Sequence, residues 1–451
     1  MIFRAYDIRG KIGRDLTPDL AEWIGQAFAT EMSTRGHSQV IIGRDNRPSS
    51  AGLAEGFGLG VRRAGLRSID IGEVATPILY NFCVRATPWP GAMITGSHLP
   101  PDQNGFKLTV GLEPFFGDDL QALRERIEQG DVMEAATPGT HEQIDFAIVR
   151  YFMDLRTRFA PAEKPLRLVV DAGNGMAGQV APDLLRALGH EVIELYCESD
   201  GTYPNHPADP FEPENLLDLQ ATVQAENADL GLAFDGDADR LGVVDAQGDS
   251  HATDRALIPL VWDVLKRNPG APIVTDPLVS QVLIDLTQAA GGRPLMWKSG
   301  HSHIKQKMQA AGAPLGLETS GHVFIADGYY GYDDGIYTAL RLVDILARTH
   351  TAPLHQIMAA VPQLHTSPQF RPTCQEAHKD TVIQAVKAAF AEYPQLDVDG
   401  VRVVLPQGWF IVRASNTEPK LSLRFEAQDA AQLEAIFGAV QAVLHQQGVN
   451  L

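Results

Sequence analysis

The feature that most constrains the fold of this chain is an alternation of strand-like and helix-like segments that restarts twice along the sequence. In the first stretch, Thr17-Pro18 supplies an N-cap and a first-turn proline for an amphipathic helix that Gly36 ends. Apolar runs at 39–43, 68–71 and 92–95 then predict short buried strands. Strands that alternate with helices are typical of a mostly parallel sheet with helices on its faces.

The pattern restarts after a predicted linker at 161–165, with a strand at 191–195. It restarts again at 272, with strands at 272–275 and 315–317 and a helix from His303 between them. The tail differs, because three strands and one helix are predicted there, at 400–405, 409–413, 421–426 and 430–445. We therefore predict an α/β protein of three similar mixed α/β domains and a smaller C-terminal α+β domain. The predicted boundaries are 1–143, 144–248, 249–360 and 361–451.

Length and charge narrow the class of protein. A chain of 451 residues is long enough for about three or four domains. The net charge of −19 argues against a nucleic-acid surface, which needs a basic face. No apolar run approaches the roughly 18 residues of a membrane span. The charged start lacks a signal-peptide pattern, and the widely spaced Cys83, Cys197 and Cys374 are typical of buried free thiols. We expect a cytoplasmic protein, a monomer or weak dimer, without nucleic-acid or membrane partners.

The first candidate for chemistry is Ser97, in the segment Thr95-Gly96-Ser97-His98-Leu99-Pro100-Pro101. The segment follows a predicted strand, and its glycine and prolines place the hydroxyl on a tight loop, where a nucleophile would be exposed. The GxSxG pattern of serine hydrolases does not occur in the chain. Taken alone, the segment also fits an ordinary capped turn.

A stronger signal is the run Asp235-Gly236-Asp237-Ala238-Asp239-Arg240, between two apolar strand-like segments. Its three carboxylates repel one another unless a cation lies between them, and in a turn their oxygens can converge on a hard ion such as Mg²⁺. Ligand-binding loops of open α/β sheets lie at such strand ends. We therefore predict a Mg²⁺ site here, with Arg240 facing the phosphate that the metal neutralises.

Two other readings of the acidic run fail on its sequence. An EF-hand needs Gly at its sixth position and Glu at its twelfth, where this chain has Arg240 and Ala246. A phosphatase with an aspartyl nucleophile usually has Thr or Val after its DxD pair, where this chain has Asp239. A solvated acidic turn is the remaining alternative.

Two later segments carry sugar-binding and phosphate-binding chemistry. Between glycines, Glu318 and Ser320 offer an acceptor and a donor–acceptor suited to vicinal sugar hydroxyls. The run 413–417 combines one guanidinium with hydroxyl, amide and loop N–H donors, a set suited to a phosphate dianion. Lys298 and His301, just before a predicted helix, add a cation and a candidate acid or base.

In this order and at these separations, the four motifs resemble those of the α-D-phosphohexomutase superfamily, most closely its bacterial bifunctional phosphomannomutase/phosphoglucomutase group. The resemblance covers essentially the whole chain, from Phe3–Gly10 to Arg424–Glu426. It implies four domains around a central cleft. It also implies interconversion of hexose 1-phosphate and hexose 6-phosphate, of mannose, glucose or both, through a phosphoserine enzyme and a hexose 1,6-bisphosphate intermediate that also acts as activator.

The resemblance implies a role for each matching residue. Ser97 would carry the phosphoryl group, which completes the coordination of one Mg²⁺ per chain held by Asp235, Asp237 and Asp239. Sugar hydroxyls would be bound by Glu318 and Ser320. The other residues expected to bind substrate or to line the reaction centre are Tyr6, Arg9, His98, Lys107, Arg240, Lys298, His301, His322, Arg413, Ser415, Asn416 and Thr417. Among these, His301, His322 or Lys107 would transfer protons.

The chain departs from the family pattern at three places. Leu99 stands where the serine loop usually has Asn, and the turn 275–279 lacks a lysine that relatives often place there. Thr319 is neither the methionine of the mannose/glucose group nor the glutamine of phosphoglucosamine mutases. A phosphoglucosamine mutase is therefore one alternative. A catalytically silent sugar-phosphate binding protein is another, although such a protein would be expected to lack Ser97 or an aspartate.

Overall fold

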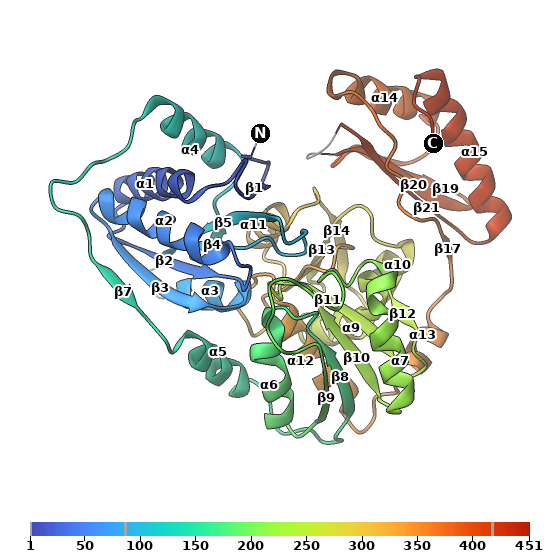
Figure 1. Cartoon of the computed structure of the whole chain (residues 1–451). Coiled ribbons are helices and arrows are strands. Elements are labelled where there is room, and N and C mark those ends of the chain that lie inside the picture. Colours follow the sequence, from blue (N-terminus) through green and yellow to red (C-terminus); the bar gives the residue numbers. More distant parts are fainter. Residues whose placement is uncertain (1, 85–87, 416–418) are drawn as a thin grey trace.

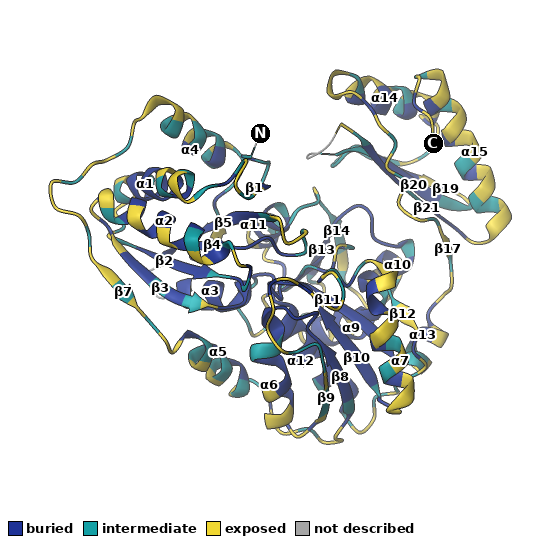
Figure 2. Ribbon diagram, viewed as in Figure 1, coloured by how far each residue is buried: buried dark blue, intermediate teal, exposed yellow. Residues whose placement is uncertain are grey.

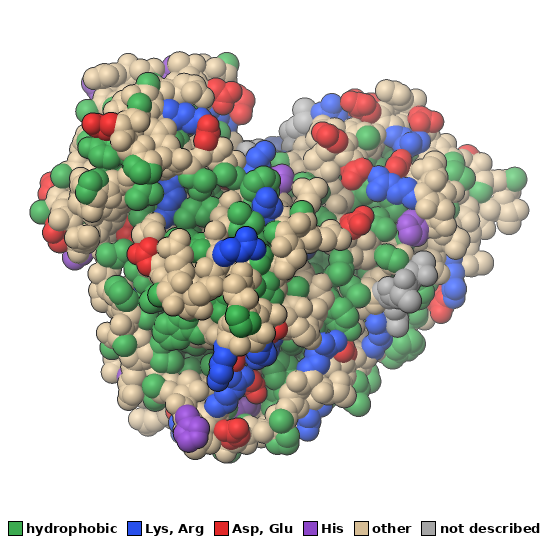
Figure 3. Space-filling view, turned by 180° about the vertical axis from the view of Figure 1, so that it is seen from behind, with side chains coloured by type: hydrophobic (Ala, Val, Ile, Leu, Met, Phe, Trp, Pro, Cys, Tyr) green, Lys and Arg blue, Asp and Glu red, His purple; other side chains and the backbone are tan. Residues whose placement is uncertain are grey.

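The first three domains repeat one four-strand pattern, and the fourth has a sheet of another kind (Figure 1). The computed structural model describes residues 2–84, 88–415 and 419–451. In Figure 1 the first domain, in blue, and the C-terminal domain, in red, form two upper lobes above the second and third domains. Figure 3, seen from behind, shows a notch between these lobes, with Lys and Arg side chains below it.

The first domain has a seven-stranded sheet with helices packed against it. Thr17 Oγ1 accepts a hydrogen bond from Leu20 N at 3.2 Å, which confirms the predicted N-cap of the first helix. The elements are β1 (Ile8–Lys11), α1 (Pro18–Thr34), β2 (Gln39–Arg44), α2 (Ser50–Arg63), β3 (Arg67–Glu73), α3 (Thr76–Cys83), β4 (Pro90–Ile94), β5 (Gln103–Val110), β6 (Glu113–Pro114), α4 (Asp118–Gln129) and β7 (His141–Gln143).

Helix α5 (Ala147–Arg156) leads into the second domain, which has a five-stranded sheet. Its elements are β8 (Arg167–Asp171), η1 (Met176–Gln179), α6 (Ala181–Ala187), β9 (Glu191–Leu195), η2 (Pro213–Leu216), α7 (Leu217–Ala225), β10 (Leu230–Phe234), β11 (Leu241–Asp245) and β12 (Ser250–His251).

The third domain has a four-stranded sheet and the fourth a five-stranded one. The third comprises α8 (Thr253–Ala256), α9 (Ile258–Arg267), β13 (Pro272–Thr275), α10 (Gln281–Ala289), β14 (Arg293–Met296), α11 (His301–Ala311), β15 (Leu315–Leu317), β16 (Val323–Ile325), α12 (Gly335–Leu346) and α13 (Leu354–Ala360). The fourth comprises β17 (His365–Thr366), α14 (Glu376–Ala389), β18 (Gln395–Leu396), β19 (Val401–Leu405), β20 (Gly408–Ala414), β21 (Leu421–Ala427) and α15 (Ala430–Gln446).

The repeated pattern places the candidate loops at equivalent positions. In each of the first three domains, three parallel strands are followed by a fourth, antiparallel strand: β4-β2-β3 with β5, β10-β8-β9 with β11, and β15-β13-β14 with β16. The loop between the third and fourth strands of each pattern carries Ser97 in the first domain, Asp235–Arg240 in the second and Glu318–His322 in the third. One topology thus supplies all three loops.

Apolar packing joins the first three domains more tightly than the fourth. One continuous core runs from Ile41 and helix α3 through the second and third domains to Val361. The C-terminal domain has its own core, and Leu278 of the third domain packs with Trp409 and Ile411 at their junction. Figure 2 shows buried strands at the centre of each domain and exposed helix surfaces outside.

These observations confirm the predicted fold class of three similar mixed α/β domains and a smaller α+β domain. In the described parts of the chain, no helix has the length and apolar character needed to cross a bilayer. Cys83, Cys197 and Cys374 are free thiols, although Cys197 is only partly buried.

Candidate active site

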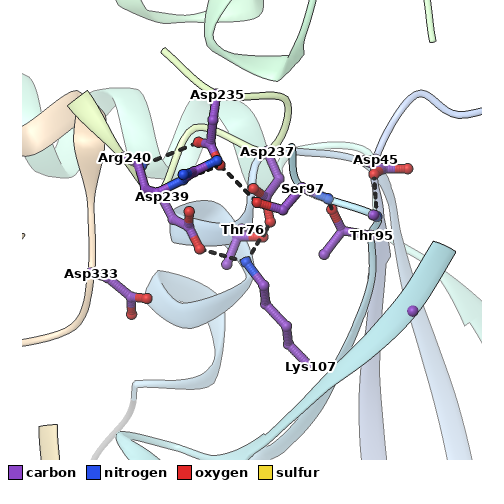
Figure 4. Close-up of polar contacts among 12 residues, drawn as sticks. Asp45, Thr76, Thr95, Ser97, Lys107, Asp235, Asp237, Asp239, Arg240 and Asp333 are labelled. Atoms are coloured by element: carbon purple, nitrogen blue, oxygen red, sulfur yellow. Dashed lines mark hydrogen bonds and ion pairs between the residues drawn. The ribbon is translucent and has the colours of Figure 1, made fainter. Parts of the chain in front are cut away.

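Ser97 lies between β4 and β5 with its hydroxyl turned toward the acidic loop of the second domain (Figure 4). Its Oγ donates to Asp235 Oδ2 at 2.7 Å and lies 3.2 Å from His98 Nδ1. The backbone at Ser97 is left-handed, with φ of 51°, a conformation that costs a non-glycine residue about 1 kcal/mol or more. Residues around the loop must therefore hold this conformation in place.

The three aspartates of the acidic loop converge, and all three are fully buried. One carboxylate oxygen from each lies within 4.8 Å of the others. Burial raises the pKa of Asp235 to about 7, although Arg240, whose Nε donates to Asp235 Oδ2 at 2.9 Å, opposes that rise. Burial likewise acts to raise the pKa of Asp237, but the adjacent Lys107 outweighs burial and lowers it. The loop is a concentrated, water-excluded negative charge.

Lys107 of β5 supplies the positive charge that these carboxylates need. Its Nζ donates to Asp237 Oδ2 at 2.7 Å and to Asp239 Oδ2 at 2.5 Å. Burial alone would lower the pKa of Lys107, but the two aspartates outweigh it and raise that pKa. The lysine is therefore held in its charged form.

The acidic loop fits a divalent cation. Among the described residues, Asp237 Oδ1 and Asp239 Oδ1 are buried without a hydrogen-bond partner, which is costly for a carboxylate. Mg²⁺ prefers sites in which all the ligands are oxygen atoms. These unpartnered oxygens belong to the same cluster as Asp235, whose Oδ2 accepts from Ser97 Oγ.

Two histidines of the third domain lie against Asp333, and one of them, His322, also approaches the acidic loop. His322 Nδ1 lies 3.3 Å from Asp333 Oδ2 and 3.7 Å from Asp239 Oδ1, and His301 Nδ1 lies 3.6 Å from Asp333 Oδ2. Burial lowers the pKa of His301, and the nearby Lys305 lowers it further. Burial also acts to lower the pKa of His322, but Asp239 and Asp333 outweigh it and raise that pKa. The His301 imidazole is thus held neutral, while that of His322 favours its charged form.

His98 resembles His301 in its charge state. Burial and the neighbouring Arg240 and Arg9 lower the pKa of His98 well below its usual value. A neutral imidazole 3.2 Å from Ser97 Oγ can exchange a hydrogen bond with that hydroxyl.

The candidate sugar-binding loop, Glu318–His322 (the sugar loop), adjoins the start of helix α11. Glu318 is buried, and one of its carboxylate oxygens accepts a hydrogen bond from Gly300 N at 2.5 Å. Burial raises the pKa of Glu318 to about 7, against the opposing effect of His322. Ser320 is exposed beside it, and its carbonyl lies 3.5 Å from Arg240 Nη1. The loop therefore combines a buried acceptor carboxylate with an exposed serine hydroxyl.

The remaining predicted residues come from the first, third and fourth domains. The Tyr6 ring packs edge-on against His301 at 5.5 Å, and Arg9 Nε pairs with Asp7. Lys298 is exposed before α11. Arg413 Nη2 lies 3.2 Å from Asp399 Oδ2, which also accepts from Ser299 N at 3.2 Å.

Ser415 is the last described residue of the predicted phosphate-binding loop, residues 413–417 (the phosphate loop). Its carbonyl accepts from Lys379 Nζ at 2.7 Å. Asn416 and Thr417 lie outside the described residues.

Several residues at this site carry no local sequence signal. Lys305 Nζ donates to Asp333 Oδ1 at 2.9 Å, and Thr76 Oγ1 donates to Asp237 Oδ2 at 2.6 Å. The paired Asp333-Asp334 before α12 is the one clue: Asp334 Oδ1 caps that helix by accepting from Tyr337 N, and Asp333 turns to the histidines.

The departures from the family pattern have structural consequences. The Leu99 carbonyl accepts from Arg47 Nη2 at 2.6 Å, a backbone contact that does not depend on the side chain at this position. Leu278, in the turn that lacks a lysine, packs against Trp409 and Ile411 of the C-terminal domain. Thr319 Oγ1 donates to the buried Asp276 at 2.8 Å. The turn 275–279 thus packs against the C-terminal domain and the sugar loop.

Comparison with protein families matches the whole architecture. The models for phosphoglucomutase/phosphomannomutase alpha/beta/alpha domains I, II and III match residues 1–133, 150–248 and 253–365. The model for the C-terminal domain of the same family matches residues 373–443.

Individual relatives align along nearly their full length. The phosphomannomutase/phosphoglucomutase of Pseudomonas aeruginosa is 48% identical over 437 residues, 96% of this chain and 93% of the relative. The phosphoglucomutase of Neisseria gonorrhoeae is 40% identical over 98% of this chain and 96% of its own. A crystal structure of a phosphoglucomutase/phosphomannomutase family protein from Burkholderia thailandensis superposes with a TM-score of 0.93 at 39% identity, covering 99% and 97% of the two chains. Sequence, fold and loop order agree, and the chain belongs to the phosphoglucomutase/phosphomannomutase family.

Proposed function

We propose that this protein interconverts hexose 1-phosphates and hexose 6-phosphates, those of mannose, glucose or both, with Ser97 as the phosphoryl carrier. The observation that carries the proposal is the 2.7 Å contact of Ser97 Oγ with Asp235, in a buried cluster of three carboxylates. A serine beside such a cluster suits phosphoryl transfer, in which positioning and electrostatic stabilisation do most of the catalytic work. The names of the relatives support the same activity.

The proposed reaction has two transfers. The bond between phosphorus and Ser97 Oγ breaks as phosphorus bonds to the free hydroxyl of the substrate, whose proton passes to a base. The resulting hexose 1,6-bisphosphate turns over, and its other phosphorus bonds to Ser97 Oγ as its bond to the sugar oxygen breaks. That sugar oxygen takes up a proton, and the isomeric hexose monophosphate leaves. Mg²⁺ bound by Asp235, Asp237 and Asp239 would neutralise the charge of the transferring phosphoryl group.

The protein's own cations and histidines have distinct tasks in this reaction. Lys107 and Arg240 stay charged and stabilise the phosphoryl oxygens. The neutral His301 is better suited than the charged Lys107 to accept the hydroxyl proton, and His322 to return one. The sugar hydroxyls would be bound by Glu318 and Ser320. The phosphate that does not react would be held by the 413–417 loop together with Tyr6, Arg9 and Lys298.

The reaction class and the nucleophile can be tested together. Conversion of glucose 1-phosphate and mannose 1-phosphate to their 6-phosphates is measured with Mg²⁺ and catalytic hexose 1,6-bisphosphate, beside Ser97→Ala and the exposed-site control Ser38→Ala. We expect Ser97→Ala to lower kcat by more than about 10³-fold and Ser38→Ala to leave it unchanged. No activity on either sugar would contradict the proposal, and activity on glucosamine phosphate alone would establish the amino-sugar alternative.

The metal requirement has a separate readout. Mn²⁺ binding, followed by electron paramagnetic resonance without substrate, is compared in the unaltered protein, Asp237→Asn and the exposed control Asp249→Asn. Because changes in groups that only orient metal ligands cost about 10- to 100-fold in affinity, loss of a ligand should cost Asp237→Asn at least that much. Equal Mn²⁺ affinity in all three proteins would show that this loop is not the metal site.

A further inference from the structure

The loop that carries Ser97 is held by a buried arginine that lies outside the four sequence motifs. Arg47 lies between β2 and α2, and the side chains of Arg47 and Asp45 are fully buried. Arg47 Nη1 donates to Pro100 O at 2.7 Å and Gln103 O at 3.1 Å. Arg47 Nη2 donates to Ser97 O at 2.7 Å and Leu99 O at 2.6 Å. Four carbonyls of one loop thus share a single guanidinium.

Asp45 completes the contact from the other side. Its Oδ2 accepts from Arg47 Nε at 3.2 Å and from Gly96 N at 3.0 Å. All five N–H donors of the guanidinium are therefore occupied within the protein. Arg47 has none left for a substrate phosphate, so it cannot be a binding residue for the sugar phosphate.

The space around this contact is filled. A Cβ added to Gly96 would lie 2.4 Å from the Arg47 Cζ. Ser97 N donates to Thr95 Oγ1 at 2.8 Å, and the Ser97 backbone keeps its left-handed φ of 51°. Because that conformation is unfavourable for serine, the carbonyl contacts on Ser97 and Leu99 supply the free energy that maintains it.

The same arginine also touches the second domain. Its Cζ lies 5.1 Å from the centroid of the Tyr203 ring, and Tyr203 OH donates to Asn46 Oδ1 at 3.3 Å. In turn, Asn46 Nδ2 donates to Asn174 O at 2.7 Å. A Cβ on Gly236, in the acidic loop, would lie 2.4 Å from Ser97 O and 2.8 Å from Tyr203 OH. Arg47 therefore lies where the serine loop, the acidic loop and the Tyr203 segment meet.

We propose that Arg47, fixed by Asp45 and backed by Tyr203, is a positioning residue that holds Ser97 Oγ against the acidic loop for phosphoryl transfer. This inference rests on the proposed function. Arg47 touches no reacting atom, and its effect passes through the backbone of residues 97–103. A displacement of about 1 Å at a reacting group can cost about 10²-fold in rate, so loss of this contact should slow the chemistry without weakening sugar-phosphate binding.

The test measures single-turnover transfer from glucose 1,6-bisphosphate to Ser97 by intact-protein mass, and the affinity for glucose 1-phosphate by calorimetry. In Arg47→Lys, one ammonium keeps the charge but cannot contact all four carbonyls. The matched control is Arg341→Lys, at a buried arginine of the third domain that donates to Asp327 O and Asp327 Oδ2, each at 2.9 Å.

We expect transfer to slow about 10²-fold in Arg47→Lys, with unchanged affinity for glucose 1-phosphate and an unchanged rate in Arg341→Lys. A normal transfer rate in folded Arg47→Lys would overturn the inference and leave Arg47 a purely structural residue. If Arg47→Lys does not fold, Tyr203→Leu decides, because loss of the ring behind the guanidinium should still slow transfer and a normal rate would overturn the inference. Absence of transfer in the unaltered protein would instead contradict the proposed function.

Discussion

His206 and Asp171 form a charged contact in the second domain whose contribution to stability depends on pH. His206 Nε2 lies 3.2 Å from Asp171 Oδ2, and Nδ1 lies 2.8 Å from Pro207 O. Burial acts to lower the pKa of His206, but the hydrogen bond and charge of Asp171 outweigh it and raise that pKa. The contact thus stabilises the fold fully below the unfolded pKa of about 6.5, and this stabilisation is lost as pH rises through the folded pKa.

We therefore predict that His206→Gln lowers the free energy of unfolding by about 1–2 kcal/mol at pH 6 and by less at pH 8.5. Urea unfolding of both proteins at the two pH values measures the difference. His365→Gln, at an exposed histidine, is the control. A loss that is equal at both pH values would contradict the assigned contact.

Single residues differ in how far the sequence could predict them. Asp235, Asp237 and Asp239 could be recognised because their chemistry is concentrated in one short run, and Ser97 because its loop matches a family motif. The role of Lys107 at the site could be predicted only from the family resemblance. Arg47, Thr76, Lys305 and Asp333 were not predicted, because they reach the site through strand pairing and domain packing that no local pattern encodes.

Elements were predicted well where periodicity or capping is strong. The strands Glu191–Leu195, Pro272–Thr275 and Leu315–Leu317 match the predicted bounds, and α1 begins at the predicted proline. Helix α11 begins at His301, not at the predicted 303, because Gly300 at φ of 118° already turns the chain into the helix. That shift places the His301 imidazole in the first turn, facing Asp333.

The acidic loop approaches the serine loop so closely that only glycine fits at position 236. A Cβ there would lie 2.4 Å from Ser97 O and 2.8 Å from Tyr203 OH. We predict that Gly236→Ala separates the two loops and lowers kcat by about 10²-fold. Steady-state kinetics beside Gly438→Ala, where an added Cβ meets nothing within 4 Å, measures the effect. Equal kcat values in the two variants would show that the close approach has no catalytic importance.

In the assembled chain, the contacts that hold the C-terminal domain against the third include a small apolar cluster and two arginines. Leu278 packs with Trp409 and Ile411. Arg402 Nη1 donates to Pro277 O at 2.8 Å and Val279 O at 2.7 Å, and Arg424 Nη1 donates to Leu278 O at 2.7 Å. Since Arg413 lies in β20, as do Trp409 and Ile411, the same contact fixes Arg413 relative to the third domain.

Leu278→Ala should therefore affect both stability and substrate binding. Truncation of a buried leucine costs about 2–5 kcal/mol, and here the loss falls on the junction between two domains. We predict that the C-terminal domain becomes more susceptible to limited proteolysis and that KM for hexose phosphate rises, because Arg413 and Ser415 are no longer held in place. Leu53→Ala, a truncation in the core of the first domain, should lower stability without raising KM. Parallel changes in the two variants would show that Leu278 acts through overall stability alone, and that the C-terminal domain is positioned by its polar contacts.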